Sequence, residues 1–562
     1  MNTASRREFL RVAALSMGGM AMVGETRAAE APAARRPNVV LMLTDDQGYG
    51  DLACHGNPHI KTPNMDRLRA EGVRFEYFYV SPVCSPTRAN LMTGRYNYRT
   101  RAIDTYAGRS MMDPDEVTMA EMLGDGGYKT GIFGKWHLGD NYPMRAMDQG
   151  FQESLVHRGG GLCQPSDWPG NTYFDPMLSR NGVDWKSKGY CTDVYTDAAL
   201  EFITAHRNEP FFCYFATNAP HTPLQIADEY AKLYLDMGLE EDTAKVYGMV
   251  TNIDDNIGRI LAKLDELGIE KNTVVIFLTD NGPQGSRKGV RYNAGLRSAK
   301  GAVYEGGIRV PCFVRWPGTL DAGKSIDRVA AHIDLLPTLL DVCGVAKREG
   351  VALDGRSLKP LLLGENTEWP DRTLYFQWHR GDAPELYRDC AARSQRYKLV
   401  NGVELYDIEA DPGELNDIAK DRPEIVREMR AGYEAWFKDV SCTRGYDPPR
   451  IHLGTPHENP VVLTRQDWRG SDGWDSDKDL GYWEVCVTEA ADYEITLRFA
   501  PVREASEARF KFGGVETAQA LESGAAACVF NRVALPQADG RLEASVLHGG
   551  EPCGVLFVEV KR

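Results

Sequence analysis

Continuous apolar runs of strand length alternate with helix-periodic segments through the first 350 residues. Asn38–Thr44 and Asn272–Thr279 are almost entirely apolar, as are Tyr128–Phe133 and Pro210–Thr217, which is typical of strands buried on both faces of a parallel sheet. A further strand is expected at Phe75–Val80. Helices are expected at Thr62–Gly72, Thr118–Leu123, Tyr195–Arg207 and Asp242–Leu267. The alternation predicts an α/β domain with a doubly wound, mixed and mostly parallel sheet.

Near Leu353 the pattern changes to short runs in which apolar and polar residues alternate. The runs between Arg372 and Asp407 predict a smaller antiparallel sheet, and Pro423–Val440 predicts a helix that packs on it. After a proline-containing break at Tyr446–Pro449, short strands and turns continue to the end, which is typical of a β-sandwich. We therefore expect a leader at 1–29, an α/β domain at 36–350, an antiparallel α+β subdomain at 351–445 and an appended β-sandwich at 450–562.

Length and charge restrict the class of protein. A chain of 562 residues exceeds one compact core, and 43% hydrophobic with 26% charged residues is the composition of an ordinary folded protein. The formal net charge of -15 argues against a nucleic-acid partner or an anionic membrane surface. Positive charge is nevertheless concentrated after residue 84, either to attract a small anion or as a solvated face. The basic residues there are Arg88, Arg95, Arg99, Arg101 and Arg109.

The N-terminus has the features of an export signal. The pair Arg6-Arg7 precedes Phe-Leu, a modest apolar run and small residues at Ala28 and Ala29, which resembles a twin-arginine signal peptide. The apolar run is too short for a comfortable membrane span, and no later segment reads as one. We expect a soluble protein exported to the periplasm or the exterior. Because this route carries folded proteins, any modification of a buried residue has to precede export.

The 12 cysteines are scattered singly, without a C-x-x-C pair, which excludes the usual zinc-ribbon and redox spacings. A disulfide between Cys163 and Cys191 is the one pairing we predict, on the ground of the oxidising compartment. The neighbours Cys54 and His55 have no partner ligands nearby, so we interpret them as a structural loop rather than a metal site.

Oxygen-bearing side chains follow two of the predicted parallel strands. Asp45 and Asp46 end the first strand, and Asp280 and Asn281 end the last, each pair after a threonine. Ligands bind at the carboxyl edge of such sheets, so these four side chains are expected to converge. Carboxylate and amide oxygens without a His or Cys cluster favour Ca²⁺ or Mg²⁺ over zinc. The alternative is that one or both pairs are ordinary solvated turns.

Other reactive side chains follow the two remaining apolar strands, Tyr128–Phe133 and Pro210–Thr217. Lys135 and His137 alternate after one strand and so point the same way, and His221 lies between two prolines after another. Lys300 belongs to a glycine-bounded loop. Each of these residues alone is compatible with an ordinary surface lysine or loop histidine.

The segment Val80–Arg95 (V-S-P-V-C-S-P-T-R-A-N-L-M-T-G-R) contains the cysteine with most chemical interest. Ser85 is a favourable N-cap and Pro86 a favourable first helical residue, so Cys84 is expected at a helix N-terminus, where an anion is stabilised. Arg88 lies one turn further along the same face. A buried structural cysteine is the alternative interpretation.

Taken together, these segments resemble the sulfatase family. C-S-P-T-R at 84–88, followed by T-G-R, resembles its signature C-x-P-S/T-R. The further matching segments are T-D-D-Q-G-Y-G-D, T-P-N-M-D-R-L, G-K-W-H-L-G, P-H-T-P, T-D-N-G, E-G-G-I-R-V-P and L-Y-D-I-E-A-D-P-G-E-L-N-D. The resemblance extends from Asn38 to about Val440 and leaves the last domain outside.

The resemblance implies a modified residue and a cation. In sulfatases a maturation enzyme oxidises the signature cysteine to formylglycine, and the hydrated aldehyde is the nucleophile. Cys84 would become this residue, in the cytoplasm and before the fold closes over it. Asp45, Asp46, Asp280 and Asn281 would hold Ca²⁺, or Mg²⁺, together with the modified Cys84.

The resemblance also implies roles for the remaining residues. Arg88 and Lys135 would steady the diol, and His137 would be the base that releases sulfate. His221 and Lys300 would grip the sulfate and help to protonate the leaving alcohol.

The substrate and two alternative functions stay open. A sulfated small molecule or glycan is expected, and export with an appended β-sandwich favours a carbohydrate by analogy. Trp168, Trp185 and Tyr375–Arg380 could line a sugar pocket or serve packing. The alternatives are a phosphoester or phosphonate hydrolase of the same superfold, and a non-catalytic glycan-binding protein in which the sandwich binds.

Overall fold

The computed structural model describes residues 36–284, 291–365, 368–471, 473–476 and 478–562, and the chain from Arg36 onward forms one compact unit. The predicted export signal at 1–29 lies outside the described residues. Within the described ranges no helix combines the length and the apolar character needed to cross a membrane. The boundaries near residues 350 and 450 stay predictions, because the chain is not divided there into separate units.

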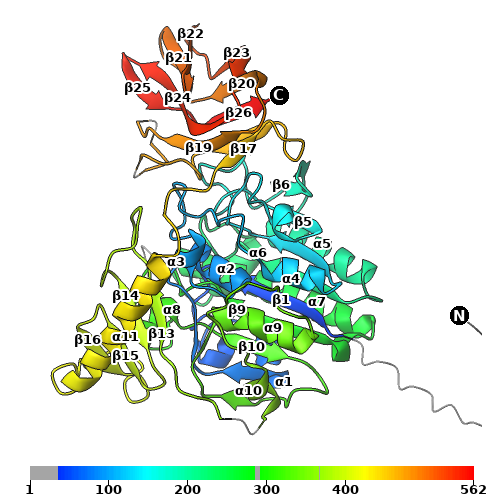
Figure 1. Cartoon of the computed structure of the whole chain (residues 1–562). Helices are drawn as coiled ribbons and strands as arrows, with labels where there is room; N and C mark the ends of the chain where they lie inside the picture. The colour runs from blue at the N-terminus through cyan, green and yellow to red at the C-terminus, as the bar shows by residue number, and fades with distance from the viewer. Residues whose placement is uncertain (1–35, 285–290, 366–367, 472, 477) are drawn as a thin grey trace, which may run out of the picture. The chain divides into compact units, whose positions relative to one another are not determined.

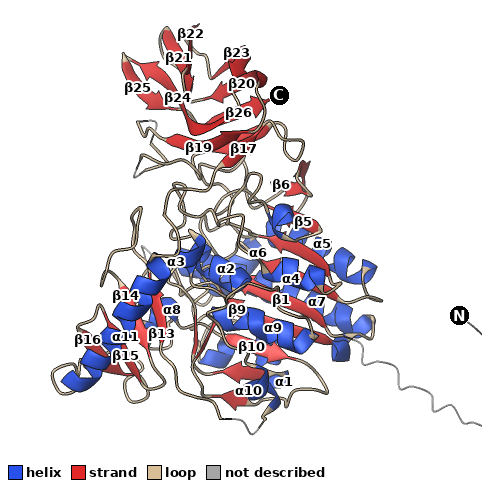
Figure 2. Cartoon of the chain, in the orientation of Figure 1, coloured by secondary structure: helices blue, strands red, loops and turns tan. Residues whose placement is uncertain are grey.

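A ten-stranded mixed sheet forms the centre of the α/β part, with strands between Asn38 and Ile326 (Figures 1 and 2). Its strands are β1 (Asn38–Thr44), β2 (Val73–Phe75), β4 (Lys129–Gly134), β5 (Glu153–Val156), β6 (Met177–Arg180), β7 (Val183–Lys186), β8 (Phe211–Ala216), β9 (Thr273–Thr279), β10 (Cys312–Arg315) and β11 (Ser325–Ile326). Their order is β11-β2-β10-β9-β1-β8-β4-β5-β6-β7. The central strands β9, β1, β8, β4 and β5 are parallel, whereas β10, β6 and β7 are antiparallel to their neighbours, which confirms the predicted fold class.

Helices cover both faces of this sheet. The helices are α1 (Pro63–Glu71), α2 (Cys84–Thr93), α3 (Asn97–Thr100), α4 (Met119–Asp125), α5 (Cys191–Ala205), α6 (Asp228–Leu235), α7 (Glu241–Glu266), α8 (Glu305–Ile308), α9 (Leu335–Cys343) and α10 (Lys359–Leu363). Alternate residues of β1 enter two different cores, with Leu41 in the core that contains α2, α4 and α9, and Met42 in the core that contains α1, α5 and α7. Burial on both faces explains the continuous apolar run of β1.

The predicted antiparallel subdomain is a four-stranded sheet with one long helix. Its strands are β13 (Leu374–Gln377), β14 (Cys390–Arg393), β15 (Tyr397–Val400) and β16 (Glu404–Asp407), and the helix is α11 (Pro423–Ser441). Lys398 of β15 lies fully buried between Glu305 and Glu414, at 3.1 and 2.9 Å. This buried ion cluster ties the small sheet to α8.

The C-terminal segment, orange to red in Figure 1, consists of two sheets. One contains β17 (Ile451–Leu453), β19 (Tyr482–Val487), β21 (Ser506–Phe512), β22 (Val515–Leu521), β24 (Ala538–His548) and β25 (Glu551–Gly554); the other contains β18 (Val461–Thr464), β20 (Ala491–Arg498), β23 (Ala527–Leu535) and β26 (Phe557–Lys561). Both sheets bury side chains in one core, which also takes in Ala107, Met111 and Met144 from the preceding part of the chain. The sandwich therefore packs on the α/β part through a shared core.

Several local predictions were wrong. Helix α2 begins at Cys84 with Val83 as its N-cap, and the Ser85 hydroxyl caps nothing. The expected strand at 75–80 is two short strands, β2 and β3 (Phe78–Tyr79), of which β3 pairs with β12 (Ala330–Ala331). Cys163 and Cys191 are free thiols, so the predicted disulfide is absent; the Cys163 thiol donates to the Asn171 carbonyl instead.

Candidate active site

The register of the central strands brings the predicted oxygen ligands together. Thr44 of β1 pairs with Thr279 of β9, so the residues that follow both strands leave the sheet side by side. Ligand atoms of Asp45, Asp46, Cys84 and Asp280 all lie within 4.8 Å of one another, and all four residues are buried. The predicted convergence is therefore present.

The donor set fits a hard divalent cation. The Nδ2 group of Asn281 donates to Asp46 at 2.8 Å, while its Oδ1 is buried without a protein partner. Burial, together with the nearby Asp45 carboxylate, raises the pKa of Asp280 to about 7. Carboxylates so close together in the interior repel one another, and a divalent cation would relieve this repulsion. An orphaned amide oxygen beside crowded carboxylates is what a calcium or magnesium site requires.

Three cationic side chains contact the same carboxylates. Arg88 donates to Asp280 at 2.9 Å and to the Lys135 carbonyl at 2.9 Å, and its guanidinium is fully buried. The ammonium of Lys135 pairs with Asp45. Lys300 reaches Asp46 at 2.7 Å. Three cations balance three carboxylates, so a bound divalent cation would leave the site with an excess of positive charge suited to an anion.

Cys84 is the first residue of α2, so it lies at the positive end of the helix dipole. Its Sγ donates to Asp45 Oδ1 at 3.3 Å. Burial raises the pKa of this thiol well above its usual range, and the Asp45 carboxylate raises it further. Position 84 is therefore a neutral thiol at physiological pH and lacks the thiolate character that a cysteine nucleophile needs.

His137 follows a turn that requires glycine. Gly134, the last residue of β4, has φ +122°, and a Cβ there would lie 1.8 Å from the Ala216 carbonyl oxygen of β8. The Nε2 of His137 lies 2.7 Å from the Thr105 carbonyl, whereas Nδ1 is buried without a protein partner. Burial and the nearby Lys135 hold the pKa of His137 well below its usual value. The imidazole is thus neutral, donates through Nε2 and offers Nδ1 as a base.

His221 also faces the Asp46 carboxylate, from the loop after β8. Its Nδ1 is 2.6 Å from the Thr222 carbonyl, and its Nε2 is 3.7 Å from Asp46. Burial lowers the pKa of His221, and Lys300 lowers it further. The free nitrogen of His221 and the ammonium of Lys300 therefore face the same carboxylate from the loops after β8 and β9.

The chain matches known proteins over the α/β part and most of the antiparallel subdomain. The sulfatase family model covers residues 37–345, and a second model, described as N-sulphoglucosamine sulphohydrolase, C-terminal, covers 298–435. The first match spans more than half of the chain. The chain belongs to the sulfatase family. It is a sulfuric ester hydrolase, and the sandwich lies beyond both matches.

Named relatives agree with this assignment. The chain is 33% identical to human arylsulfatase A over 463 residues, which is 71% of this chain and 87% of that protein. It is 34% identical to mouse N-acetylgalactosamine-6-sulfatase over 382 residues, 63% of this chain and 70% of that one. Its fold is similar to the crystal structure of Ps i-CgsB in complex with k-i-k-neocarrahexaose, with TM-score 0.67 and 30% identity, covering 74% of this chain and 95% of that one.

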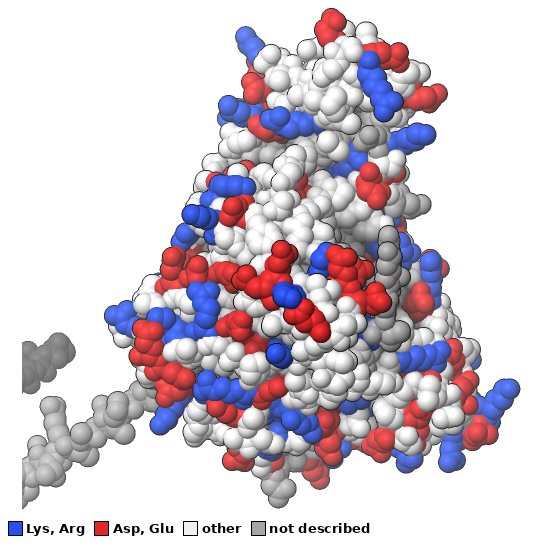
Figure 3. All heavy atoms as spheres, turned by 180° about the vertical axis from the view of Figure 1, so that it is seen from behind, with Lys and Arg blue, Asp and Glu red and all other residues white. Residues whose placement is uncertain are grey.

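The other arginines of the basic run do not reach the sulfatase site. They form ion pairs with acids elsewhere in the fold: Arg95 with Glu116, Arg99 with Asp354 and Asp439, Arg101 with Asp113, and Arg109 with Asp382. The face in Figure 3 shows acidic and basic side chains intermixed. Among the residues that the structure describes, Arg88, Lys135 and Lys300 are the cations that pair with the site carboxylates.

Two aromatic residues of the predicted stretch Tyr375–Arg380 lie in different surroundings. Tyr375 stacks on Trp436, with ring centroids 5.1 Å apart, and belongs to the packing of α11. Trp378 lies against Gly301, where an added Cβ would come within 3.1 Å of its ring, and its indole donates to Asp104 at 3.0 Å. Trp378 is therefore the aromatic side chain of that stretch beside the Lys300 loop.

Sequence reasoning missed two residues that contact His137. Thr105 acts through its backbone carbonyl, and Gln466, from the sandwich, donates to that carbonyl at 2.8 Å. A backbone carbonyl has no sequence signature, and Gln466 lies outside the segments that resemble the family. The sequence carries no signal that would have found either.

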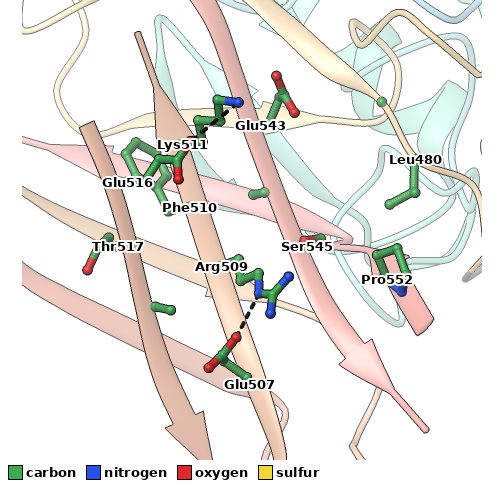
Figure 4. Close-up of a pocket in the computed structure, with 13 residues that line it drawn as sticks. Leu480, Glu507, Arg509, Phe510, Lys511, Glu516, Thr517, Glu543, Ser545 and Pro552 are labelled. Atoms are coloured by element: carbon green, nitrogen blue, oxygen red, sulfur yellow. Dashed lines mark hydrogen bonds and ion pairs between the residues drawn. The ribbon is translucent and has the colours of Figure 1, made fainter. Parts of the chain in front are cut away.

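The sandwich has a shallow hollow of about 510 Å³ over β21, β22 and β24 (Figure 4). Its two cations are paired: Arg509 with Glu507 at 2.7 Å, and Lys511 with Glu516 at 3.4 Å. Glu543 adds a further carboxylate. The lining thus has more acids than bases, so the hollow does not match a sulfate group.

Proposed function

We propose that this sulfatase hydrolyses sulfate esters of a carbohydrate, with formylglycine at position 84 as nucleophile and a divalent cation, Ca²⁺ or Mg²⁺, held by the modified residue with Asp45, Asp46, Asp280 and Asn281. The observation that carries the proposal is the position of Cys84, buried at the N-terminus of α2 with its Sγ within 4.8 Å of carboxylate oxygens of Asp45, Asp46 and Asp280. Burial there raises the pKa of the thiol well above its usual range. Such a thiol is a poor nucleophile, whereas a hydrated aldehyde there would have an acceptor, cations and a base within reach.

The bound cation would supply positive charge. This charge would lower the pKa of a hydroxyl of the hydrated aldehyde at position 84 and offset the negative charge on the sulfate oxygens. Arg88 and Lys135 hold the diol at position 84. One hydroxyl of the diol passes its proton to Asp45, which accepts from the side chain at this position, and its oxygen attacks sulfur. The S–O bond to the alcohol breaks, and the Lys300 ammonium gives the proton that the leaving oxygen needs, passed on through Nε2 of His221.

His137 completes the cycle. Its Nδ1 takes the proton of the remaining hydroxyl, the C=O bond re-forms, and the C–O bond to sulfate breaks. Sulfate leaves and the aldehyde is restored. The neutral state and free Nδ1 of His137 support this role.

A sulfated glycan is the substrate class we infer. The supports are the sugar named in N-acetylgalactosamine-6-sulfatase and the hexaose bound to Ps i-CgsB. We also propose that the 1–29 segment exports the folded enzyme, so that a formylglycine-generating enzyme acts on Cys84 in the cytoplasm.

The test is a comparison of kcat/KM on paired sulfate and phosphate esters of the same sugars. We expect sulfate esters to be preferred by at least about 100-fold, because the chain belongs to the sulfatase family and discrimination is set by differential binding of the two transition states. Preference for the phosphate or phosphonate ester would overturn the proposal. Binding of the sulfated glycan without turnover would favour the glycan-binding alternative.

A further inference from the structure

We propose that Gln466 of the β-sandwich is a positioning residue for His137, which it orients by holding the Thr105 carbonyl. The sandwich would then be part of the catalytic machinery rather than an appended module. The inference rests on the proposed role of His137 as the base, but its geometry stands independently.

The amide of Gln466 is committed to two acceptors. Its Nε2 donates to the Thr105 carbonyl and to Ser110 Oγ, both at 2.8 Å, and the side chain is 2% exposed. An amide NH₂ has two protons, so none remains for His137 Nε2, which lies 3.4 Å away. Gln466 therefore acts on His137 indirectly, by donating to the Thr105 carbonyl that also accepts from His137.

That carbonyl determines which nitrogen of His137 is basic. The Thr105 oxygen accepts from His137 Nε2 at 2.7 Å and from Gln466, so both of its lone pairs are used. A carbonyl cannot donate, so Nε2 carries the proton and Nδ1 is the free base. Without Gln466, one bond alone would hold the carbonyl in place and the ring could turn.

The sandwich anchors Gln466 rigidly. The backbone carbonyl of Gln466 accepts from Gly108 N at 2.8 Å, which fixes the loop that carries Thr105. The neighbouring Arg465 donates to the Val555 and Gly554 carbonyls at 2.9 Å within the sandwich. Two residues of the two parts also stack, Tyr106 on Trp474, with centroids 5.0 Å apart. The loop is thus held by the sandwich at several points.

The test is Gln466→Met in the full-length mature enzyme, with Gln519→Met as the matched control. Methionine keeps the length and the burial but has no donor. Gln519 lies exposed on β22 of the same sandwich. The first measurement is ¹⁵N NMR of histidine-labelled protein, with the His137 signal assigned by its loss in His137→Asn. We expect the His137 nitrogen shifts to change in Gln466→Met and to stay unchanged in the control.

The second measurement is steady-state and pre-steady-state kinetics on a sulfate ester. Because His137 acts after the alcohol has left, we expect kcat to fall by about 10- to 100-fold and KM to fall with it, leaving kcat/KM close to wild type. In the first turnover, about one molecule of alcohol per enzyme molecule should be released rapidly, in a burst, before the slower steady state that is limited by release of sulfate. A merely structural defect would lower kcat/KM and give no burst.

Unchanged His137 shifts, or kinetics equal to those of Gln519→Met, would overturn the inference. If Gln466→Met does not fold, Gln466→Glu is used, because it keeps the length but cannot donate to the Thr105 carbonyl. A wild-type enzyme without sulfatase activity would refute the proposed function, whereas the His137 shifts would still decide the role of Gln466.

Discussion

Lys135→Met is the perturbation that probes the charge balance of the site most directly. Lys135 is fully buried, and its ammonium pairs with Asp45. Methionine keeps the aliphatic stem and removes the charge. Breaking a buried pair by removing one partner costs about 3–5 kcal/mol. Because Arg88 still lies 3.9 Å from Asp45, we expect the free energy of unfolding to fall by about 3 kcal/mol, the lower end of this range.

The same variant tests the cation site. Asp45, Asp46 and Asp280 are balanced by three cations in the wild type, so the substitution leaves an excess of one negative charge. A divalent cation should therefore bind the variant more tightly, and each tenfold gain in affinity adds about 1.4 kcal/mol to the stabilisation at saturation. We predict that saturating Ca²⁺ stabilises Lys135→Met more than it stabilises the wild type.

The assay is urea unfolding of both proteins, with chelator and with Ca²⁺. Lys129→Met is the control, since Lys129 lies partly exposed at the other end of β4, and we expect it within about 0.5 kcal/mol of wild type. Equal stabilisation of Lys135→Met and wild type by Ca²⁺ would refute the charge-balance argument, and no stabilisation of either protein would refute the cation site. Unchanged stability of Lys135→Met in chelator would refute the reasoning about the buried pair.

Three further predictions follow from the structure. His221→Gln should lower kcat/KM by about 10²–10³-fold for sulfated sugars and much less for nitrophenyl sulfate, whose leaving group needs no proton; equal losses would contradict its role as proton donor. Removal of divalent cations by a chelator should abolish turnover, and Ca²⁺ or Mg²⁺ should restore it in the same sample; persistent activity would speak against the cation. Lys398→Met should cost about 3–5 kcal/mol in urea unfolding, because Glu305 and Glu414 would lose their shared cation, whereas Lys420→Met on the surface should be neutral.

The central strands and their reactive ends were predictable for a physical reason. A parallel strand buried on both faces must be apolar throughout, so β1 stands out in the sequence and ends where Asp45 begins. The carboxyl ends of such strands meet at one edge of the sheet, which is why Asp280 could be placed beside Asp45 without a structure.

The edge strands and the sandwich contacts were not predictable in the same way. Strand β7 has only four residues and is largely exposed, so its short apolar–polar alternation is not enough to distinguish it from a loop. The start of α2 differs from expectation because Val83, rather than Ser85, occupies the N-cap position. The contact of Gln466 with the Thr105 carbonyl joins positions 361 residues apart and depends on docking of the sandwich.

The most direct test of the account is the chemical state of residue 84 in enzyme purified from its native host. Peptide mass spectrometry should find the aldehyde in place of the thiol, and Cys84→Ala should fold normally but lose roughly 10⁴-fold or more of the sulfatase activity. An unmodified thiol in fully active enzyme, or normal turnover by Cys84→Ala, would contradict the account.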